Sequence, residues 1–368
     1  MAPARSRLGK ARRVVVKVGS RALARDAGFP DRLAREIAAA RAAARGDARA
    51  FVVVSSGAIA LGCERLGYRK RPSDMGALQA AAAAGQSALM RRWDEAFGAV
   101  GLTSAQVLLT HADLADRERL NNARDALGAL LEAGAVPVVN ENDTVATDEI
   151  RFGDNDQLAS MVAPLVAAEL LVLLTDVEGV LDPRGDRIPI FDERSEVGKV
   201  VTAGAVVGRG GMESKLDAAR KAARAGATAV IAPAGRDGVL GAVLAGADVG
   251  TLFPPVGEVL RARKHWIAYT LRPRGTVLVD EGAARALASG KSSLLPIGVL
   301  GVRGEFGPGD GVLVVGPDGA EVGRGLARLG ALDVARAAGK KGSALELVLG
   351  RSADDVVVVH RDDLVLGA

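Results

Sequence analysis

The feature that most constrains the fold is an alternation of short, unbroken apolar runs with alanine-rich helical stretches, which continues to about residue 232. The apolar runs predict strands at 12–18, 50–54, 107–109, 136–139, 170–174 and 229–232. The stretches between them predict helices at 31–45, 75–97, 117–132, 155–166 and 212–224. Several strands are apolar throughout, as is typical of strands covered on both faces. The pattern therefore predicts a three-layer α/β/α sandwich with a mainly parallel central sheet.

The pattern changes after Thr251. The run Phe253-Pro254-Pro255 breaks any regular element. From about Gly275 onward, short strand-like runs are separated by glycine-rich turns, which predicts a small, mostly β barrel or sandwich at the C-terminus. We therefore expect a catalytic domain over 1–258, a linker over 259–274, and a small β domain with a C-terminal extension over 275–368.

Composition excludes several classes of protein. The chain has 368 residues with a net charge of only +4, and its lysines and arginines are spread along it, which gives little support to nucleic-acid binding. The single cysteine, Cys63, excludes an internal disulfide and a cysteine-based zinc site. No segment approaches the ~18 uninterrupted apolar residues that a membrane span needs. A cytoplasmic protein without membrane contact is the expectation.

Two common nucleotide-binding motifs are absent. Residues 289–292, Ser-Gly-Lys-Ser, resemble the end of a Walker A loop, but Arg285 stands where its first glycine is needed. No Gly-x-Gly-x-x-Gly follows the first strand. The histidines His111, His265 and His360 are far apart in sequence and form no metal-spaced pair, which argues against imidazole-based chemistry.

Polar segments instead follow the predicted strands, at 17–20, 55–58, 140–143, 153–156 and 175–176. In open α/β sheets, ligands bind beyond the carboxyl ends of the strands. A sixth segment, 208–212, is glycine-rich and precedes the helix that carries Lys215. We therefore expect these segments to form one site.

Two lysines are candidate phosphate ligands. Lys17 follows apolar residues and precedes Gly19 and Ser20, so its ammonium could face a phosphate; the alternative is an edge-strand lysine that reaches solvent. Gly210 and Gly211 at a helix start could bind an anion through unpaired N–H groups. Lys215 lies one turn later and could reach back over that terminus, or it could be a solvated helix lysine.

The acidic and amide clusters suggest an amino-acid site. Asn140, Asp143, Asp154, Asn155 and Asp156 offer acceptors for an ammonium group and a carboxylate that could orient lysines or a metal. Solvated acidic turns are the alternative. Ser56 could hold a carboxylate with nearby backbone donors, or could belong to an ordinary strand-to-helix turn.

Taken in order, these segments resemble the amino acid kinase family and, within it, the glutamate 5-kinases. The resemblance covers nearly the whole chain. It rests on the stretches VVKVGS, VVSSGAIALG, AAAGQSALM, LLTHADLADRERLNNARDAL, PVVNENDTVAT, FGDNDQLAS, LLTDVEGV and GGMESKLDAA. The tail, which includes SSLLPIGVLGVRGEFGPGDGVLVV, resembles a PUA domain, which implies a small, mostly β barrel.

The resemblance implies roles for individual residues. Lys17 and Lys215 would stabilise the transferring phosphoryl group, and Asp156 would orient them. The residues that would bind glutamate are Ser56, Asn140, Asp143, Asp154 and Asn155. Those that would bind ATP are Lys17, Gly19, Ser20, Thr175, Asp176, Arg209, Gly210, Gly211, Met212, Glu213, Ser214 and Lys215. Arg209 departs from the family, which usually carries threonine there. Arginine could replace the hydroxyl contact with a charged fork, or it could point to solvent and weaken ATP binding.

The implied reaction is ATP-dependent phosphorylation of the side-chain carboxylate of L-glutamate, the first step of proline biosynthesis. The carboxylate is ionised at neutral pH and needs no general base. Mg²⁺ would bridge ATP phosphates, held partly by water and by one carboxylate whose identity is unknown. The resemblance also implies a homo-oligomer, a dimer or tetramer, and feedback inhibition by proline.

Two other functions remain open from the sequence. The chain could phosphorylate acetylglutamate, aspartate or a nucleotide with the same fold. It could also act as an RNA-binding regulatory protein through its tail, although Phe306 is the only aromatic residue there for base stacking.

Overall fold

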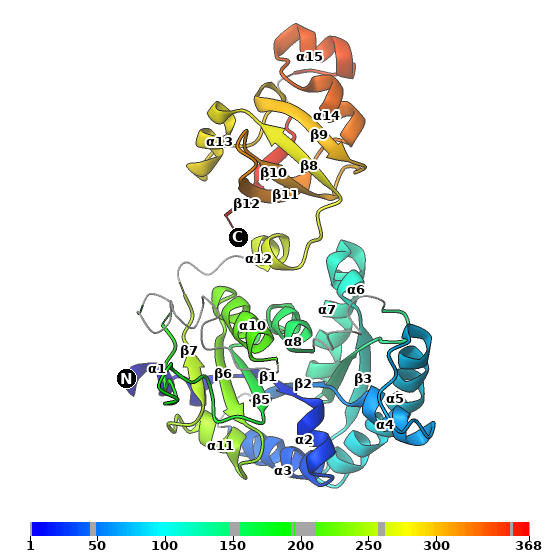
Figure 1. Cartoon of the computed structure of the whole chain (residues 1–368). Coiled ribbons are helices and arrows are strands. Elements are labelled where there is room, and N and C mark those ends of the chain that lie inside the picture. Colours follow the sequence, from blue (N-terminus) through cyan, green and yellow to red (C-terminus); the bar gives the residue numbers. More distant parts are fainter. Residues whose placement is uncertain are drawn as a thin grey trace. The chain divides into compact units, whose positions relative to one another are not determined.

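The computed structural model describes residues 2–44, 49–146, 155–192, 195, 211–256, 262–353 and 356–367. The chain divides into two compact units, Met1–Val259 and Leu260–Ala368 (Figure 1). Among the described residues, the first unit holds a seven-stranded sheet and the second a five-stranded sheet. The site predicted from the sequence falls in the first unit.

The sheet of the first unit has the strand order β3-β4-β2-β1-β5-β6-β7. All neighbours pair in parallel except β7, which is antiparallel to β6. This confirms the predicted mainly parallel sheet. Its strands are β1 (Arg13–Val18), β2 (Ala50–Ser55), β3 (Ser104–Leu109), β4 (Val136–Glu141), β5 (Leu170–Thr175), β6 (Thr228–Pro233) and β7 (Thr251–Phe253).

Helices cover both faces of this sheet, and several begin at a side chain that caps the first turn. Asp74 accepts a hydrogen bond from the backbone of Ala77 at the start of α5, and Thr110 forms a capping box with Asp113 at the start of α6. The helices are α1 (Ala2–Arg5), α2 (Ser20–Arg25), α3 (Phe29–Ala42), α4 (Ala58–Arg65), α5 (Met75–Gly98), α6 (His111–Ala115), α7 (Arg117–Glu132), α8 (Asn155–Leu165), α10 (Met212–Arg224) and α11 (Val239–Leu244), with a 3₁₀ turn η1 (Leu8–Lys10).

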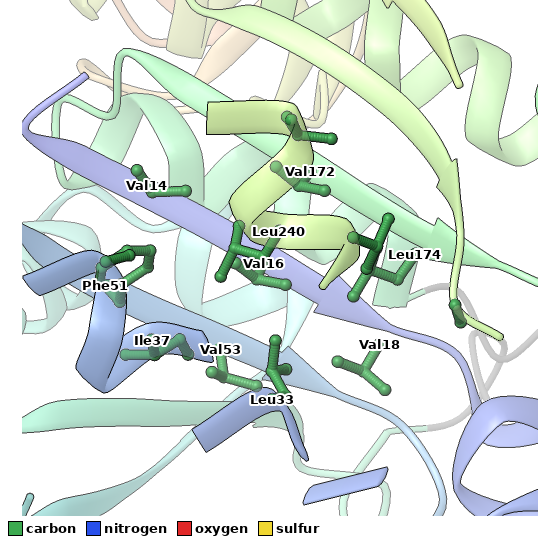
Figure 2. Packing of buried hydrophobic residues seen from close by; sticks show 14 of the residues in the cluster. Val14, Val16, Val18, Leu33, Ile37, Phe51, Val53, Val172, Leu174 and Leu240 are labelled. Atoms are coloured by element: carbon green, nitrogen blue, oxygen red, sulfur yellow. The ribbon is translucent and has the colours of Figure 1, made fainter. Parts of the chain in front are cut away.

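Successive side chains of β1 point to opposite faces of the sheet, so each face has its own core. Val14, Val16 and Val18 lie in the core that also contains residues of α3, α5 and α11. Figure 2 shows Val16 and Val18 in this cluster with Leu33 of α3. Val15 lies in the other core, with residues of α7, α8 and α10. By the same alternation, Lys17 faces α8 and α10.

The helices α4 and α5 cross in backbone contact. A Cβ atom on Gly62 of α4 would lie 1.6 Å from the carbonyl oxygen of Ala81 in α5, and one on Gly85 would lie 1.8 Å from that of Ala58. Only glycine therefore fits at either position. The crossing fixes α4, which begins directly after Ser56 and Gly57.

The N-terminal segment is held by a buried arginine. The guanidinium of Arg5 donates hydrogen bonds to the carbonyl oxygens of Pro189, Ala247, Val249 and Gly250, at 2.8 to 3.2 Å. It also forms an ion pair of 3.0 Å with Asp248. These contacts join the first helix to the segment that leads into β7.

Two expectations need correction. β1 is the fourth of seven strands in the sheet order, so the alternative of Lys17 as an edge-strand residue is wrong. The strand predicted at 107–109 begins earlier, at Ser104, because β3 is an edge strand and its polar residues Ser104 and Gln106 interrupt the apolar run.

The second unit is β-rich, as predicted, but contains more helix than its turn-rich sequence indicates. Its sheet has the order β12-β11-β10-β8-β9, in which only β8 and β10 pair in parallel. Its core lies between this sheet and the helices α13, α14 and α15. The elements are α12 (Ala262–Tyr269), β8 (Gly275–Val279), α13 (Glu281–Ala288), η3 (Pro296–Gly298), β9 (Val299–Gly304), β10 (Gly311–Val315), β11 (Glu321–Ala327), α14 (Ala331–Ala337), α15 (Gly342–Leu349) and β12 (Val359–Leu366).

Candidate active site

Two lysines from distant parts of the chain meet at one carboxylate. Asp156, in the first turn of α8, lies 2.7 Å from the Nζ atom of Lys17 and 3.1 Å from that of Lys215. The exposed fractions of Lys17 and Asp156 are 4% and 5%. Burying a charged lysine costs free energy unless an opposite charge pairs with it, so the ion pair with Asp156 offsets the cost of burying Lys17. The result is a group with one negative and two positive charges, an excess of one cation.

The start of α10 contributes the second lysine. Gly211 is the N-cap residue and has a φ of 80°, a left-handed conformation that favours glycine. Lys215 lies one turn into the helix, and its ammonium donates a hydrogen bond of 3.1 Å to the carbonyl oxygen of Gly211. Lys215 thus reaches back over the helix start, as predicted, and is not a solvated helix lysine.

A cavity of about 940 Å³ opens on this charged group. It lies at the carboxyl ends of β1, β5 and β6, where ligands of such sheets bind. Within it, Asp176 pairs with Arg21 at 2.9 Å and accepts a hydrogen bond of 3.2 Å from Thr175. The hydrogen bond from Arg21 lowers the pKa of Asp176 below its ordinary value. The sequence-predicted residues on its wall are Lys17, Gly19, Ser20, Ser56, Asp156, Thr175, Asp176, Gly211, Ser214 and Lys215.

A second cavity, of about 670 Å³, adjoins the first, because Ser20 and Ser56 line both. Its other sequence-predicted residues are Asn140, Asp143 and Asn155.

A chain of amides forms the floor of this smaller cavity. Asn155 donates hydrogen bonds of 3.0 Å to the hydroxyl of Ser56 and to the side-chain oxygen of Asn140. Asn140 in turn donates one of 2.8 Å to Gln86 on α5. The Oδ1 atom of Asn155 is buried and accepts no hydrogen bond from any described residue. Such an acceptor favours a ligand that carries N–H donors.

Asp143 lies at the rim of the smaller cavity. Burial raises its pKa to about 6, and the positive charge of Arg71 partly opposes that shift. A half-buried carboxylate with one cation nearby is suited to bind a second cation from a ligand.

Some residues of the site were not identified from the sequence. Gln86 and Arg21 each lie within a helix and carry no local signal that separates them from solvated helix residues. Met212 and Glu213 begin α10 but are not among the described residues that line the larger cavity.

Three predicted site residues, Asp154, Arg209 and Gly210, lie outside the described residues.

Comparisons with known proteins agree with this architecture. The sequence model of the amino acid kinase family matches residues 12–233, and that of the PUA domain matches residues 275–349. Glutamate 5-kinases from Pseudomonas putida and Pseudomonas fluorescens are each 47% identical to this chain over 371 residues, which is 98% of this chain and 100% of theirs.

Among solved structures, N-acetylglutamate synthase from Neisseria gonorrhoeae superimposes with a TM-score of 0.51. It is 18% identical, and the match covers 70% of this chain and 62% of that protein, which shows a likeness of fold alone. No helix in the described parts of this chain is long and apolar enough to cross a membrane.

Proposed function

We propose that this chain, which belongs to the amino acid kinase family and within it to the glutamate 5-kinases, transfers the γ-phosphate of ATP to the side-chain carboxylate of L-glutamate. The products are L-glutamyl 5-phosphate and ADP, and the reaction is the first step of proline biosynthesis. The observation that carries the proposal is 47% identity to glutamate 5-kinases over 98% of this chain.

The two adjoining cavities fit this reaction. The larger one would hold ATP and the smaller one glutamate, so that the γ-phosphate and the acceptor carboxylate meet near Ser20 and Ser56. A bond forms between a carboxylate oxygen and the γ-phosphorus, and the bond from that phosphorus to the bridging oxygen breaks. ADP leaves with the electron pair of the broken bond.

The protein's part is alignment and charge stabilisation, because phosphoryl transfer needs little covalent chemistry from the enzyme. Lys17 and Lys215 would face the phosphoryl oxygens, on which negative charge is spread in the transition state. Asp156 would hold both ammonium groups in place before ATP arrives, and its ion pairs with both support that role.

Glutamate would be held by the amide floor and by Asp143. Its ammonium group would supply donors to the Oδ1 atom of Asn155 and to the carboxylate of Asp143, while Ser56 would bind its side-chain carboxylate. The contacts of Asn155 with Ser56 and Asn140 support this arrangement.

ATP would lie beside Gly19, Thr175 and the first turn of α10. The described residues hold no cluster of three or more side chains that could ligate a metal. Mg²⁺ would be held by phosphate oxygens, by water and by one carboxylate of this chain, as is usual for this ion in kinases. Bound there, it would neutralise charge on the triphosphate.

Three further properties belong to the proposal: a cytoplasmic location, assembly as a dimer or tetramer, and inhibition by proline. The RNA-binding alternative finds no support in the second unit, because its PUA-like residues contain one aromatic side chain, Phe306, which is buried in the core.

The test is an assay of ADP release by the purified protein with ATP, Mg²⁺ and L-glutamate, N-acetylglutamate, aspartate or UMP. Hydroxylamine is added to trap an acyl phosphate as the hydroxamate. Turnover with glutamate alone, with hydroxamate formed, is the expected result. Turnover only with another acceptor would overturn the substrate while leaving the family unchanged.

A further inference from the structure

The rim of the smaller cavity carries a row of cations that the assignments above do not use. The loop between α4 and α5 places Arg69, Lys70 and Arg71 on the cavity wall, and the same wall includes Asp143. The crossing of α4 and α5 at Gly62 and Gly85 fixes the two helices from which this loop projects.

A free amino acid has charges of both signs, which cations and a carboxylate on one cavity wall can bind. The α-carbon of glutamate carries a positive ammonium group and a negative carboxylate side by side. Asp143 and the amide floor can accept hydrogen bonds from the ammonium group, but they offer no positive charge to the α-carboxylate. Lys17 does not line the smaller cavity, and its ammonium is paired with Asp156.

Arg71 is the best placed of the three cations. Its side chain lines the same cavity as Asp143, and its positive charge acts on the carboxylate of Asp143. Arg71 also precedes Pro72, which restricts its backbone to extended conformations and reduces the entropy lost on binding. A guanidinium can bind a carboxylate through two parallel N–H donors, which an ammonium cannot match.

We propose that Arg71 binds the α-carboxylate of the amino-acid substrate and so makes the site selective for acceptors that carry a free α-carboxylate. This inference rests on the proposed function. Asp143 and Arg71 then form a pair of opposite charges that matches the pair on the α-carbon of the substrate.

The test compares L-glutamate with its α-amide, which keeps the ammonium group and the side-chain carboxylate but has no charge on the α-carboxyl group. For Arg71→Ala, kcat/KM for glutamate should fall about 10- to 100-fold, the range for loss of a hydrogen-bonded charged contact. The kcat/KM for the α-amide should stay within about threefold, because a neutral amide gains little from the guanidinium. Arg71→Lys should recover part of the preference for glutamate over its α-amide.

Arg91→Ala is the matched control, because it removes the same charge from an exposed position on α5 away from the cavity. Equal losses for both acceptors in Arg71→Ala would mean a structural role and would overturn the inference. An unchanged kcat/KM for both acceptors would overturn it as well.

Calorimetric binding of glutamate and of its α-amide, without ATP, separates this inference from the proposed function. If the protein binds glutamate but does not phosphorylate it, the proposed function fails, while the role of Arg71 is still decided by the two affinities. If the unaltered protein binds both compounds equally well, or binds neither, the inference is wrong.

Discussion

At the scale of single residues, the site depends on charges that are buried together. Asp156 lies between Lys17 and Lys215, so removal of one lysine leaves the carboxylate with a partner. This matters for experiments, because a buried charge without a partner costs several kcal/mol and obscures any effect on catalysis. Lys215 is the better lysine to replace, since the more buried pair of Lys17 with Asp156 remains.

We expect Lys215→Ala to lower kcat by about 10²- to 10³-fold, the usual effect of losing one preorganised donor at a developing negative charge. The KM for glutamate should change by less than about threefold, because this lysine faces the phosphoryl group and not the amino acid. Lys221→Ala is the control: it lies on the same helix and pairs with Asp217, and it should leave kcat near that of the unaltered protein. A rise in the KM for glutamate at constant kcat would contradict the assignment.

The pKa of Asp143 predicts how substrate binding depends on pH. With that pKa raised to about 6 by burial, the carboxyl is mostly neutral at pH 5 and mostly ionised at pH 7. An ammonium group binds the ionised form, so the KM for glutamate should rise about tenfold as pH falls from 7 to 5. The side-chain carboxylate of glutamate is still mostly ionised at pH 5 and contributes little to this change.

Steady-state kinetics from pH 5 to 7 with Asp143→Asn provides the check. The variant should have a high KM for glutamate that does not change with pH, since its amide does not titrate. The other ionisable groups on this cavity wall remain in the variant: Cys63, Glu64, Tyr68, Glu141 and the cations at 69–71. If the variant kept the pH dependence, one of them would be responsible instead of Asp143.

The sequence located the segments of this site but not the contacts within it. Strand ends and glycine-rich turns mark where ligands bind, which is why Lys17, Asp156 and Lys215 were identified together. Gln86 and Arg71 could not be found in this way, since a glutamine within a helix and an arginine in a loop are ordinary solvent-exposed residues. Their relevance comes from Asn140 and Asp143, which other segments of the chain bring beside them.

At the scale of helices and strands, the crossing of α4 and α5 holds the amino-acid cavity in shape. Gly85→Ala would place a methyl group against the carbonyl oxygen of Ala58 and push the helices apart. We expect a loss of about 2 kcal/mol or more in the free energy of unfolding, together with a higher KM for glutamate, because Ala58 follows Ser56 closely. Gly98→Ala, at the end of α5 with open space around it, should be neutral or slightly stabilising.

Thermal unfolding of the two variants measures the difference. If Gly85→Ala and Gly98→Ala melt at the same temperature, the helices can separate at little cost. The crossing would then not be what fixes α4.

A carboxylate from another element caps α11. Glu36 of α3 accepts hydrogen bonds from the backbone N–H groups of Gly238, Leu240 and Gly241, at 3.0, 2.7 and 3.4 Å. Glu36→Ala should lower the free energy of unfolding by about 1–2 kcal/mol, the usual contribution of an N-cap. Urea unfolding is the measurement, with exposed Arg35→Ala as the control. Equal midpoints for the two variants would show that the cap contributes nothing.

The cap also shows why part of the fold was not predicted. The long helices and the buried strands follow from apolar runs that are each visible within a few residues. Short helices such as α2 and α11 depend on contacts between residues far apart, as Glu36 and Gly238 are separated by 202 positions. The antiparallel β7 has three residues, too few for a pattern, and its place is set by pairing with β6.

At the scale of the whole molecule, the two units have separate cores. The hydrophobic clusters on the two faces of the seven-stranded sheet end at Phe253, and the cluster of the second unit begins at Val277. Compact units that each have their own core should unfold as separate cooperative units.

Phe306→Ala is a large-to-small change in the core of the second unit. We therefore expect it to reduce that unit's free energy of unfolding by about 3–5 kcal/mol and so to lower the temperature of one calorimetric transition. The transition of the first unit should stay within about 1 °C of its original temperature. Leu347→Ala, at a side chain that is 87% exposed, should move neither transition. A single transition that shifts as a whole in Phe306→Ala would mean that the units unfold together.

The contacts of Arg5 have a consequence for biosynthesis. Arg5 is synthesised well before its partner Gly250, which lies 245 positions later in the chain. At the usual pace of bacterial translation, that interval is about 12–50 s. During that time the N-terminal segment has to wait without its final contacts, while the central strand β1 can already pair with β2. The contacts of Arg5 therefore join two segments of the first unit that are synthesised at widely separated times.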